Sequence, residues 1–384
     1  MPGLLFELPE LPASAQRLRR SVRRFLQKEL AGYSPLARSA SWDGYDSAFS
    51  GKLGAAGFIG VALPRRYGGR GAGMLDRYVV LEECLAAGAP TGLHWFADRQ
   101  SGPLLLKYGS EAQRRAILPG ICRGELCFCI GMSEPDAGSD LAALRTQGRR
   151  VENGWILNGT KLWTTNAHRA DYMIALVRTA APTAVRHDGF SQFLIDLKRS
   201  PGIRIRPVRD LAGREHFNEV TFNDCLVPPD ALIGEEGRGW DQVTAELALE
   251  RSGPERYLSC HVLFEQLLVV LAGSRDTRAR ELVGRLVARL STLRAMSLAV
   301  AGMLDTGEDP GLQASIVKDL GADFEQSLPG ICQELVDLPP SAAPDASDYQ
   351  QVLASLTMLS PSFSLRGGTV EILRGIVARN LGLR

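Results

Sequence analysis

The stretch Asn153–Thr179, NGWILNGTKLWTTNAHRADYMIALVRT, decides the fold class of this 384-residue chain. It contains two Asn-Gly pairs, Asn153-Gly154 and Asn158-Gly159, among short runs rich in β-branched and aromatic residues. An Asn-Gly pair between such runs is a strong signal for a tight turn joining antiparallel strands. The stretch therefore predicts short strands with hairpin turns at both pairs, and it places Trp163 just after the second turn.

Runs of the same kind continue downstream, as SQFLIDL at 191–197, IRIRPV at 203–208 and EVTFND at 219–224. Several short strands at close spacing predict a small barrel or sandwich. We expect this β domain to cover residues 126–236.

The segments on both sides follow the 3.6-residue period of helices. SAQRLRRSVRRFLQKEL precedes the strands, and long amphipathic runs such as LQASIVKDLGADFEQSLPG follow them. Because strands and helices do not alternate, the pattern excludes a doubly wound parallel sheet. The prediction is an α+β chain with an N-terminal helical domain over 1–125, a β-barrel over 126–236 and a C-terminal helical bundle over 237–384.

Composition narrows the class of protein. Apolar residues make up 45%, charged residues 23%, and the net charge is +1, so no nucleic-acid partner is expected. The seven cysteines are scattered, and Cys127-Phe-Cys129 lacks the spacing of a metal site, so we expect no metal and a reduced, cytoplasmic compartment. The most apolar later stretch, VLFEQLLVVLAG at 262–273, is too short to span a membrane.

Two glycine-rich stretches resemble nucleotide-binding loops. Gly54–Gly60 has the wrong spacing for a dinucleotide fingerprint, and GGRGAG at 68–73 follows a proline-containing turn rather than a strand. Both are interpreted as structural turns.

Two segments carry candidate ligand-binding residues. In GMSEPDAGSDLAALRT, at 131–146, small residues and hydroxyls let backbone N–H groups approach a flat polar ring or a phosphate; the alternative is a turn closed by Asp136 or Ser139. Trp163 beside Thr164 and Thr165 suits an aromatic ligand that needs a stacking wall and hydrogen bonds; the alternative is a tryptophan at the barrel rim.

The C-terminal segment SFSLRGGTVEILRGIVARN also indicates a ligand site. Gly367 and Gly368 permit close backbone approach, and Thr369 is suited to cap the helix that follows. The N–H groups at such a helix start favour an anion or a carbonyl oxygen. The glycines offer no side chain to move a proton, so a base must lie elsewhere.

Five stretches, in this order, resemble the flavin-dependent acyl-CoA dehydrogenases across nearly the whole chain. They are GFIGVALPRRYGGRGAG, SEPDAGSDLAALRT, NGTKLWTTNAHRADYMIALVRT, HFNEVTFNDCLVPPDALIGEEGRGW and GGTVEILRGIVARNLGL. The resemblance implies a helical domain, a central β-barrel and a C-terminal four-helix bundle. It also implies FAD, an acyl-CoA substrate that loses an α proton to a carboxylate and a β hydride to flavin N5, and an electron-transfer flavoprotein as acceptor.

The resemblance also assigns cofactor residues by position. They are Met132, Ser133, Gly138, Ser139, Trp163, Thr164, Thr165, Thr369 and Glu371. Met132 and Ser133 are expected at the flavin's pyrimidine edge and Ser139 at the FAD phosphates. Trp163 is expected to cover one face of the ring, with Thr165 near N5.

The sequence position of the catalytic base differs from the commonest pattern of the family. Many members have the catalytic Glu at the position of Gly367; a minority carry it in an LxxER-type segment, which ELALER matches at Glu250, directly before Arg251. We therefore expect Glu250 to be the base, the Gly367 N–H to hold the thioester carbonyl, and Arg251 to bind substrate or pack internally. Glu246, one turn earlier, shares this face. The alternative is that Glu250 only pairs with an arginine of the bundle.

Two further departures concern substrate and assembly. The missing side chain at Gly367 favours a branched or bulky acyl group, such as a steroid side chain. The RxxFG segment and the Gln- and Gly-rich segment that complete FAD binding across family tetramers are absent. We expect the base-bearing chain of an α2β2 heterotetramer with a second acyl-CoA dehydrogenase-like chain, or a homo-oligomer that uses Arg275 or Arg278. An oxidase or monooxygenase-like enzyme and a non-catalytic partner subunit remain alternatives.

Overall fold

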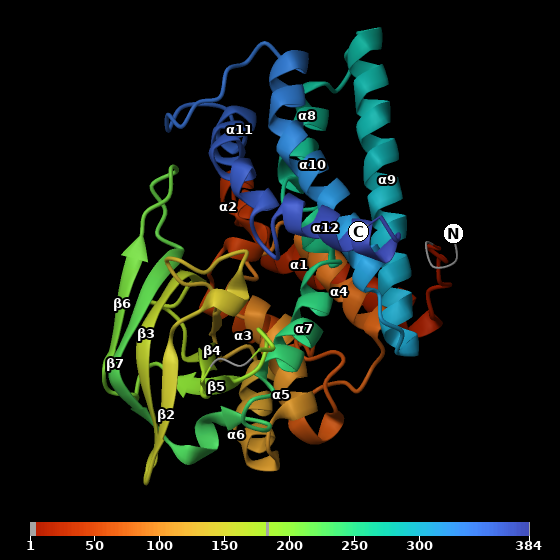
Figure 1. The fold of residues 1–384 in the computed structure, drawn as a ribbon. Helices are drawn as coiled ribbons and strands as arrows, with labels where there is room; N and C mark the ends of the chain where they lie inside the picture. Colours follow the sequence, from red (N-terminus) through yellow and green to blue (C-terminus); the bar gives the residue numbers. More distant parts are fainter. Residues whose placement is uncertain (1–4, 182–183, 384) are drawn as a thin grey trace. The chain divides into compact units, whose positions relative to one another are not determined.

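The computed structural model describes residues 5–181 and 184–383, apart from the side chains of Leu247–Glu250 (Figure 1). Its contacts divide the chain into two compact units. The helical unit comprises Met1–Gly44, Ala72–Thr91 and Ala248–Arg384, and the sheet unit comprises Tyr45–Gly71 and Gly92–Leu247. The order of helices, strands and helices confirms the predicted α+β fold class. The boundaries at 125/126 and 236/237 stay predictions.

The sheet unit contains short helices and all the strands of the described residues. Its helices are α3 (Ser47–Ala55), α5 (Gly102–Tyr108) and α6 (Glu111–Cys122). Its strands are β1 (Phe128–Gly131), β2 (Gln147–Val151), β3 (Gly154–Thr165), β4 (Tyr172–Arg178), β5 (Phe190–Asp196), β6 (Ile203–Val208), β7 (Phe217–Val227) and β8 (Leu232–Ile233).

Within the described residues these strands form one sheet in the order β6-β7-β3-β2-β4-β5-β8, and β1 pairs in parallel with β4. The long strand β3 pairs antiparallel with both β2 and β7. Alternate residues of a strand face the same side, so Trp155, Leu157 and Lys161 of β3 are all buried. Trp155 meets Phe193 of β5 edge-on in the core, with ring centroids 5.2 Å apart.

One of the two predicted hairpin turns is wrong. Asn153-Gly154 does lie at the turn between β2 and β3. Asn158-Gly159 instead lies inside β3, at a register shift against β7, so Trp163 ends this strand rather than following a turn. The Asn158 side chain is held by Asp224 of β7, and a Cβ on Gly159 (φ 144°) would lie 2.4 Å from Thr146 Oγ1. Close approach of a neighbouring segment, not chain reversal, requires this glycine.

The glycine-rich stretches near the N-terminus are turns, as predicted, except that Gly54 still belongs to α3. Gly57, Gly60, Gly68 and Gly71 all have positive φ, between 61° and 90°. Gly60 donates its N–H to Asp98 Oδ1 at 2.8 Å, within the sheet unit.

The helical unit consists mainly of helices drawn from both ends of the chain. They are α1 (Ala13–Glu29), α2 (Pro35–Ser39), α4 (Met74–Ala86), α8 (His261–Val270), α9 (Thr277–Thr306), α10 (Gly311–Leu335), α11 (Asp348–Leu359) and α12 (Val370–Asn380). The helix α7 (Gly239–Glu250) crosses the boundary between the two units at Leu247.

Among the described residues only α9 is long and apolar enough to cross a membrane. It packs along α4 and α10, as Figure 1 shows for α9 and α10. Arg294 of α9 pairs with Glu82 of α4 at 2.6 Å, and Arg289 pairs with Asp323 of α10 at 2.7 Å. These contacts attach α9 to the helical unit, although only 39% of its apolar window is buried.

Candidate functional site

The Met132–Asp140 loop, which leaves β1, contains the first set of predicted cofactor residues. Two backbone hydrogen bonds between Glu134 and Ala137, at 2.9 and 3.1 Å, close a tight turn inside it. Neither Asp136 nor Ser139 closes this turn, in contrast to the alternative interpretation. Gly138 and Ser139 are exposed, and a Cβ on Gly138 would meet no atom within 4 Å of the described residues. The loop thus presents small exposed groups on a fixed turn.

A buried lysine fixes this loop from behind. Lys161 is 0% exposed, and its Nζ donates to Glu134 Oε1 at 2.8 Å and to the Met132 carbonyl at 3.1 Å. The Glu134 carboxylate also accepts the backbone N–H groups of Arg145 (2.6 Å) and Thr146 (2.9 Å). Each buried charge is therefore both paired and hydrogen-bonded, as burial requires.

The pair's protonation follows from this geometry. Burial lowers the pKa of Lys161 to about 8, and Glu134 opposes the shift. Burial acts to raise the pKa of Glu134, but the Lys161 charge and the donated hydrogen bonds outweigh it and hold that pKa below its ordinary value. The carboxylate is therefore ionised near neutral pH.

The end of β3 carries the second set. Trp163 is 57% exposed with φ 62°, and it meets Phe217 edge-on at 5.9 Å between ring centroids. Thr164 is buried, and its hydroxyl has no hydrogen-bond partner among the described residues. Leu162 donates its N–H to the Ser133 carbonyl at 2.9 Å, which joins this strand end to the Met132–Asp140 loop. The structure thus brings the two predicted sets together within the sheet unit.

These residues fit a flavin. An exposed indole offers a flat apolar wall, and Thr164 adds a hydroxyl that no described residue satisfies. The open space at Gly138 and the exposed Ser139 leave room for a bulky anionic group. The donor set contains hydroxyls and backbone N–H groups, which suit ring heteroatoms and phosphates.

The predicted thioester-binding residues lie in the helical unit. Gly367 and Gly368 have φ of 69° and 102°, so the backbone turns through the left-handed region twice in succession. Arg251 donates its Nε–H to the Gly367 carbonyl at 3.2 Å. Among the described residues, no acceptor lies in hydrogen-bond range of the Gly367 N–H. Gly367–Gly368, the glycine turn, therefore presents a donor without a partner in the described part of the chain.

Thr369 follows the glycine turn and caps α12 as predicted. Its side chain accepts the N–H of Ile372. Glu371 lies exposed in the first turn of α12, where its own backbone N–H and the Thr369 hydroxyl hold its pKa below the ordinary value. The negative side chain therefore sits at the positive end of the helix dipole.

The proposed base ends α7. Glu250 is the last residue of this helix, and its side chain lies outside the described residues. Glu246, one turn earlier, is buried and accepts a hydrogen bond from Gln192 Nε2 at 3.3 Å within the sheet unit. Glu246 thus has a structural partner of its own.

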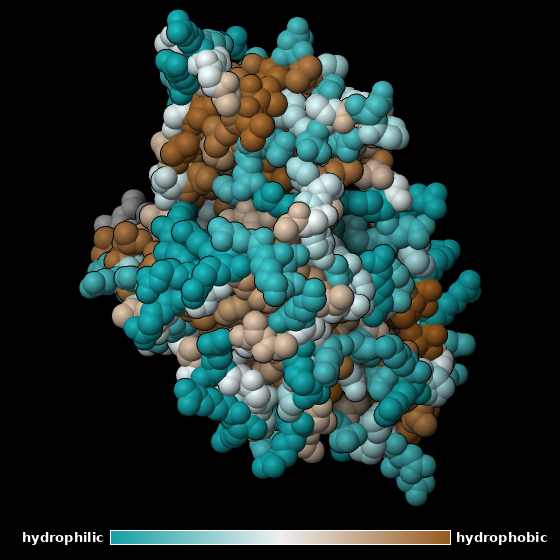
Figure 2. Space-filling view, turned by 180° about the vertical axis from the view of Figure 1, so that it is seen from behind, coloured by the Kyte–Doolittle hydropathy of each residue, from teal (hydrophilic) through white to brown (hydrophobic). Residues whose placement is uncertain are grey.

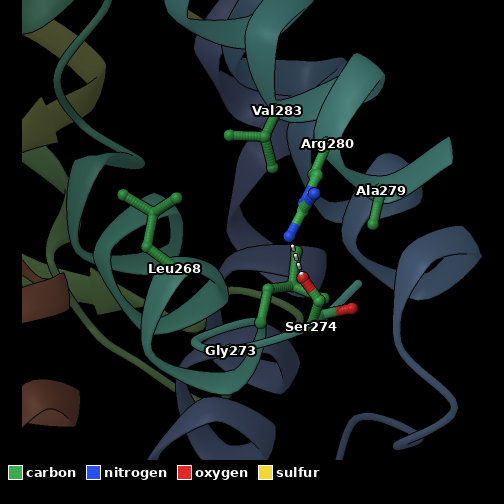
Figure 3. A pocket seen from close by; sticks show the side chains of 7 residues that line it. Leu268, Gly273, Ser274, Ala279, Arg280 and Val283 are labelled. Atoms are coloured by element: carbon green, nitrogen blue, oxygen red, sulfur yellow. Dashed lines mark hydrogen bonds between the residues drawn. The ribbon is translucent and has the colours of Figure 1, made fainter. Parts of the chain in front are cut away.

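The connection between α8 and α9 is the place where the expected RxxFG segment is absent. An open pocket of about 350 Å³ lies here, lined by Leu268, Leu271, Gly273, Ser274, Ala279, Arg280 and Val283 (Figure 3). Arg280 points into this region and donates to the Ser274 carbonyl at 3.0 Å. Of the two arginines proposed as substitutes, Arg275 is exposed and Arg278 lies 3.8 Å from Glu334.

Apolar surface gathers over the same end of the helical unit (Figure 2). The exposed large apolar side chains there are Leu268, Val269, Val270 and Val287. A contiguous exposed apolar surface of this kind is typical of a protein interface.

Sequence reasoning missed the importance of Lys161. Its signal was available, because Lys161 falls on the inward-facing alternation of a strand that includes Trp155 and Leu157. A lysine at such a position needs a buried partner.

Comparison with known proteins supports the family that the sequence motifs indicate. Residues 12–125 match the family model "acyl-CoA dehydrogenase, N-terminal domain", and residues 129–225 match "acyl-CoA dehydrogenase, middle domain". The chain is 32% identical over 383 residues to acyl-CoA dehydrogenase IpdE1 of Mycobacterium tuberculosis, covering 96% of this chain and 97% of that protein.

Two solved structures are similar over nearly the whole chain. The Tcur3481-Tcur3483 steroid ACAD superimposes with a TM-score of 0.86 and 26% identity, covering 98% of this chain and 99% of that one. The ChsE4-ChsE5 complex of Mycobacterium tuberculosis superimposes with a TM-score of 0.82 and 26% identity, covering 98% and 99%.

Proposed function

The chain belongs to the acyl-CoA dehydrogenase family of flavoprotein oxidoreductases, and we propose that it dehydrogenates a branched or bulky acyl-CoA thioester with bound FAD. The glycine turn carries the proposal. It presents the Gly367 N–H without an acceptor among the described residues, at the position where the family holds the thioester carbonyl. Such a donor stabilises the negative charge that develops on this oxygen as the α proton leaves.

Each proposed site residue has a distinct role in the dehydrogenation. Glu250, enclosed by the bound thioester, is the base that takes the α proton, because desolvation raises a carboxyl pKa toward the range a base requires. The β hydrogen leaves with its electron pair, and the product carries a double bond between the α and β carbons. The flavin, when bound, supplies the hydride acceptor. Trp163, Thr165 and the Met132–Asp140 loop are the groups proposed to hold it.

The substrate class rests on space beside the α carbon. The absence of a side chain at Gly367 leaves room there for a branch or a ring. The similarity to a protein described as a steroid ACAD supports a CoA thioester of a steroid or other cyclic side chain, in β-oxidation of lipids.

We propose that the chain assembles with a second acyl-CoA dehydrogenase-like chain in an α2β2 complex and acts in the cytoplasm. Two similar structures are each named for two chains, and the RxxFG segment is missing here. The apolar surface over α8 and α9 supports an interface at this end. A homo-oligomer is the alternative, and an electron-transfer flavoprotein is the proposed acceptor.

The first test is a visible absorption spectrum of the chain purified alone, before and after addition of a cyclic acyl-CoA. A flavin band that bleaches on addition makes the chain a self-sufficient dehydrogenase and contradicts the two-chain proposal. Absence of a flavin band, restored by co-expression with a second family chain, supports it.

The base is tested by Glu250→Gln in the flavin-loaded enzyme. We expect turnover to fall by about 10³-fold while flavin content is unchanged. Glu281→Gln, an exposed carboxylate of α9, is the matched control and leaves the rate unchanged. An unchanged rate in Glu250→Gln, with a large loss in Glu246→Gln, would move the base one turn along α7. An unchanged rate in both variants, measured in the complex assembled with a second family chain, supports the alternative that this chain is a non-catalytic partner subunit.

The oxidase or monooxygenase-like alternative differs in its acceptor. Oxygen uptake is measured with substrate and no electron-transfer flavoprotein. Uptake that matches substrate consumption supports the oxidase alternative, and negligible uptake supports the dehydrogenase.

A further inference from the structure

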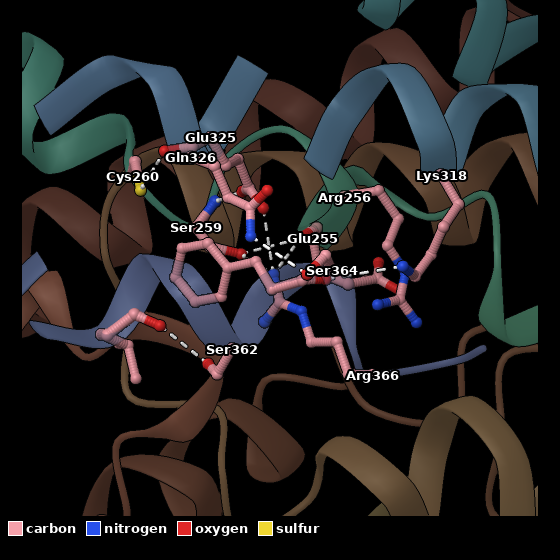
Figure 4. A network of polar contacts seen from close by, with 12 residues as sticks. Glu255, Arg256, Ser259, Cys260, Lys318, Glu325, Gln326, Ser362, Ser364 and Arg366 are labelled. Atoms are coloured by element: carbon pink, nitrogen blue, oxygen red, sulfur yellow. Dashed lines mark hydrogen bonds and ion pairs between the residues drawn. The ribbon is translucent and has the colours of Figure 1, made fainter. Parts of the chain in front are cut away.

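A largely buried arginine directly precedes the glycine turn. The Arg366 side chain is only 15% exposed, and its Nη2 donates to Glu325 Oε2 (3.1 Å), Ser259 Oγ (2.7 Å) and the Glu255 carbonyl (3.1 Å). Figure 4 shows the arginine reaching into this cluster between α10 and the segment before α8. Three acceptors from two parts of the chain therefore converge on one nitrogen.

The guanidinium also contacts two aromatic rings. Its Cζ lies 4.5 Å from the ring centroid of Trp42 and 4.3 Å from that of Phe363. A planar guanidinium can stack on aromatic rings and use its edge for hydrogen bonds at the same time. A lysine ammonium cannot make this combination of contacts.

The acceptors of Arg366 are themselves fixed. Glu325 Oε1 accepts the backbone N–H of Ser259 at 2.6 Å, and Ser259 Oγ donates to the Glu255 carbonyl at 2.7 Å. Glu325 is 1% exposed. The cluster is therefore a rigid anchor rather than a set of mobile surface groups.

The segment before Arg366 is held by the same helix. Gln326 of α10 donates to the Pro361 carbonyl and to Ser364 Oγ, both at 3.1 Å. Lys318, also of α10 and 1% exposed, donates to the Phe363 carbonyl at 3.5 Å. The chain thus enters the glycine turn from a fixed starting point.

The glycine turn needs such support from its neighbours. Two successive glycines lose more backbone entropy on ordering than any other pair, and they carry no side chain that could hold them. Their conformation depends on Arg366 before the turn, Arg251 at the Gly367 carbonyl and the Thr369 cap after it. Of these three, Arg366 is the one whose side chain joins the turn to α10 through Glu325.

We infer that Arg366 is a positioning residue whose clamp on Glu325, Ser259 and the two rings fixes the direction of the Gly367 N–H toward the thioester carbonyl. This inference rests on the proposed function, which assigns that N–H to the thioester. We assign Arg366 a positioning role because its Nη2 donates to the cluster, while its Nε and Nη1 are buried without a hydrogen-bond partner among the described residues.

The test uses the flavin-loaded enzyme with Arg366→Lys, which keeps the charge and loses the planar clamp. Two ligands with the same cyclic acyl chain are compared: the CoA thioester, and a CoA thioether that lacks the carbonyl oxygen. We expect kcat/KM for the thioester to fall about 10- to 100-fold, mainly in kcat, because misdirecting one donor of charge stabilisation costs this much. Affinity for the thioether is expected to stay within about twofold, because it never uses the Gly367 N–H.

Two further variants control for a general effect of replacing an arginine and for misfolding. Arg374→Lys changes an exposed arginine of α12 that pairs with Asp319 of α10 at 3.0 Å, and it is expected to leave both ligands unaffected. The double variant Arg366→Met with Glu325→Gln removes both buried charges. It is expected to keep the fold even if the single lysine variant does not, and to show the same selective loss on the thioester.

The outcomes distinguish failure of the proposed function from failure of the positioning role of Arg366. If the wild-type enzyme turns over no acyl-CoA, the proposed function fails and Arg366 has no thioester to position. If the wild type is active and the Arg366 variants keep their kcat/KM, or lose affinity for thioester and thioether equally, the positioning role is wrong and the cluster is purely structural.

Discussion

Two buried cations lie behind the two predicted ligand-binding loops, and they hold them in opposite ways. Lys161 belongs to a neighbouring strand and reaches into the Met132–Asp140 loop, where it bonds to the loop's own Met132 carbonyl and Glu134 carboxylate. Arg366 belongs to the supported segment itself and reaches outward to Glu325 on another helix.

The difference predicts different consequences of losing the cation. Without Lys161, the ionised Glu134 carboxylate stays inside the loop that it shapes. Without Arg366, the remaining carboxylate is Glu325, whose pKa burial already raises above the ordinary value against the opposing charge of Arg366. Protonation relieves Glu325 more easily than Glu134, so the Met132–Asp140 loop depends more strongly on its ion pair than the glycine turn does.

The largest expected effect therefore comes from Lys161→Met. Breaking a buried pair from one side leaves an uncompensated charge, and we expect a loss of about 3–5 kcal/mol in unfolding free energy together with loss of bound flavin. Chemical denaturation and the flavin absorbance per chain measure the two. The double variant with Glu134→Gln is expected to recover much of the stability. A single variant that keeps both stability and flavin would show that this pair does not hold the loop.

The next largest expected effect is a loss of folding stability at acid pH, caused by protonation of His94 in the sheet unit. His94 is buried with its Nδ1 2.9 Å from Ser50 Oγ, and burial lowers its pKa to about 3. A base with a depressed folded pKa contributes stability that is present above its unfolded pKa of about 6.5 and is lost as pH falls toward the folded value. Between pH 6.5 and 4.5 this loss is about 2–3 kcal/mol.

The measurement is urea denaturation at both pH values for the wild type and for His94→Asn, with hydrogen exchange to locate the loss. The asparagine variant is expected to lose less stability between the two pH values, and the wild-type loss is expected in the sheet unit. Equal pH dependence in both proteins would remove His94 as the cause.

A smaller effect, on the helical side, is expected from Gly321→Ala in α10. A Cβ there would lie 2.1 Å from the Arg256 carbonyl oxygen, a backbone atom that cannot move alone. We expect a cost of about 1–3 kcal/mol in thermal or urea unfolding. Gly330→Ala, in the same helix with no neighbour within 4 Å among the described residues, is expected to gain up to about 1 kcal/mol. A neutral Gly321→Ala would mean that the contact relaxes freely.

The sequence predicted the surroundings of the Met132–Asp140 loop better than those of the glycine turn. The strand pattern and the order of elements were readable because period and turn chemistry are local, and Lys161 falls on a buried alternation that the pattern contains. Asn158-Gly159 misled because the same dipeptide serves a turn and a close approach, and only the partner strand decides between them.

The clamp on Arg366 was not readable. Trp42 and Glu325 are far from Arg366 in sequence, and no local period connects them. The position of the proposed base came from resemblance alone, and the Glu250 side chain lies outside the described residues.

The smallest effect is expected at an exposed charge pair that involves the end of the Met132–Asp140 loop. Arg186 donates to both carboxylate oxygens of Asp140 at 2.8 Å, yet the two side chains are 66% and 58% exposed. Water competes for both partners and salt screens them, so Asp140→Asn is expected to cost no more than about 0.5 kcal/mol. Urea denaturation at low and at high salt measures this cost and its screening. A loss as large as that of Lys161→Met would show that exposure does not separate the two pairs, and that contact with the Met132–Asp140 loop alone sets their importance.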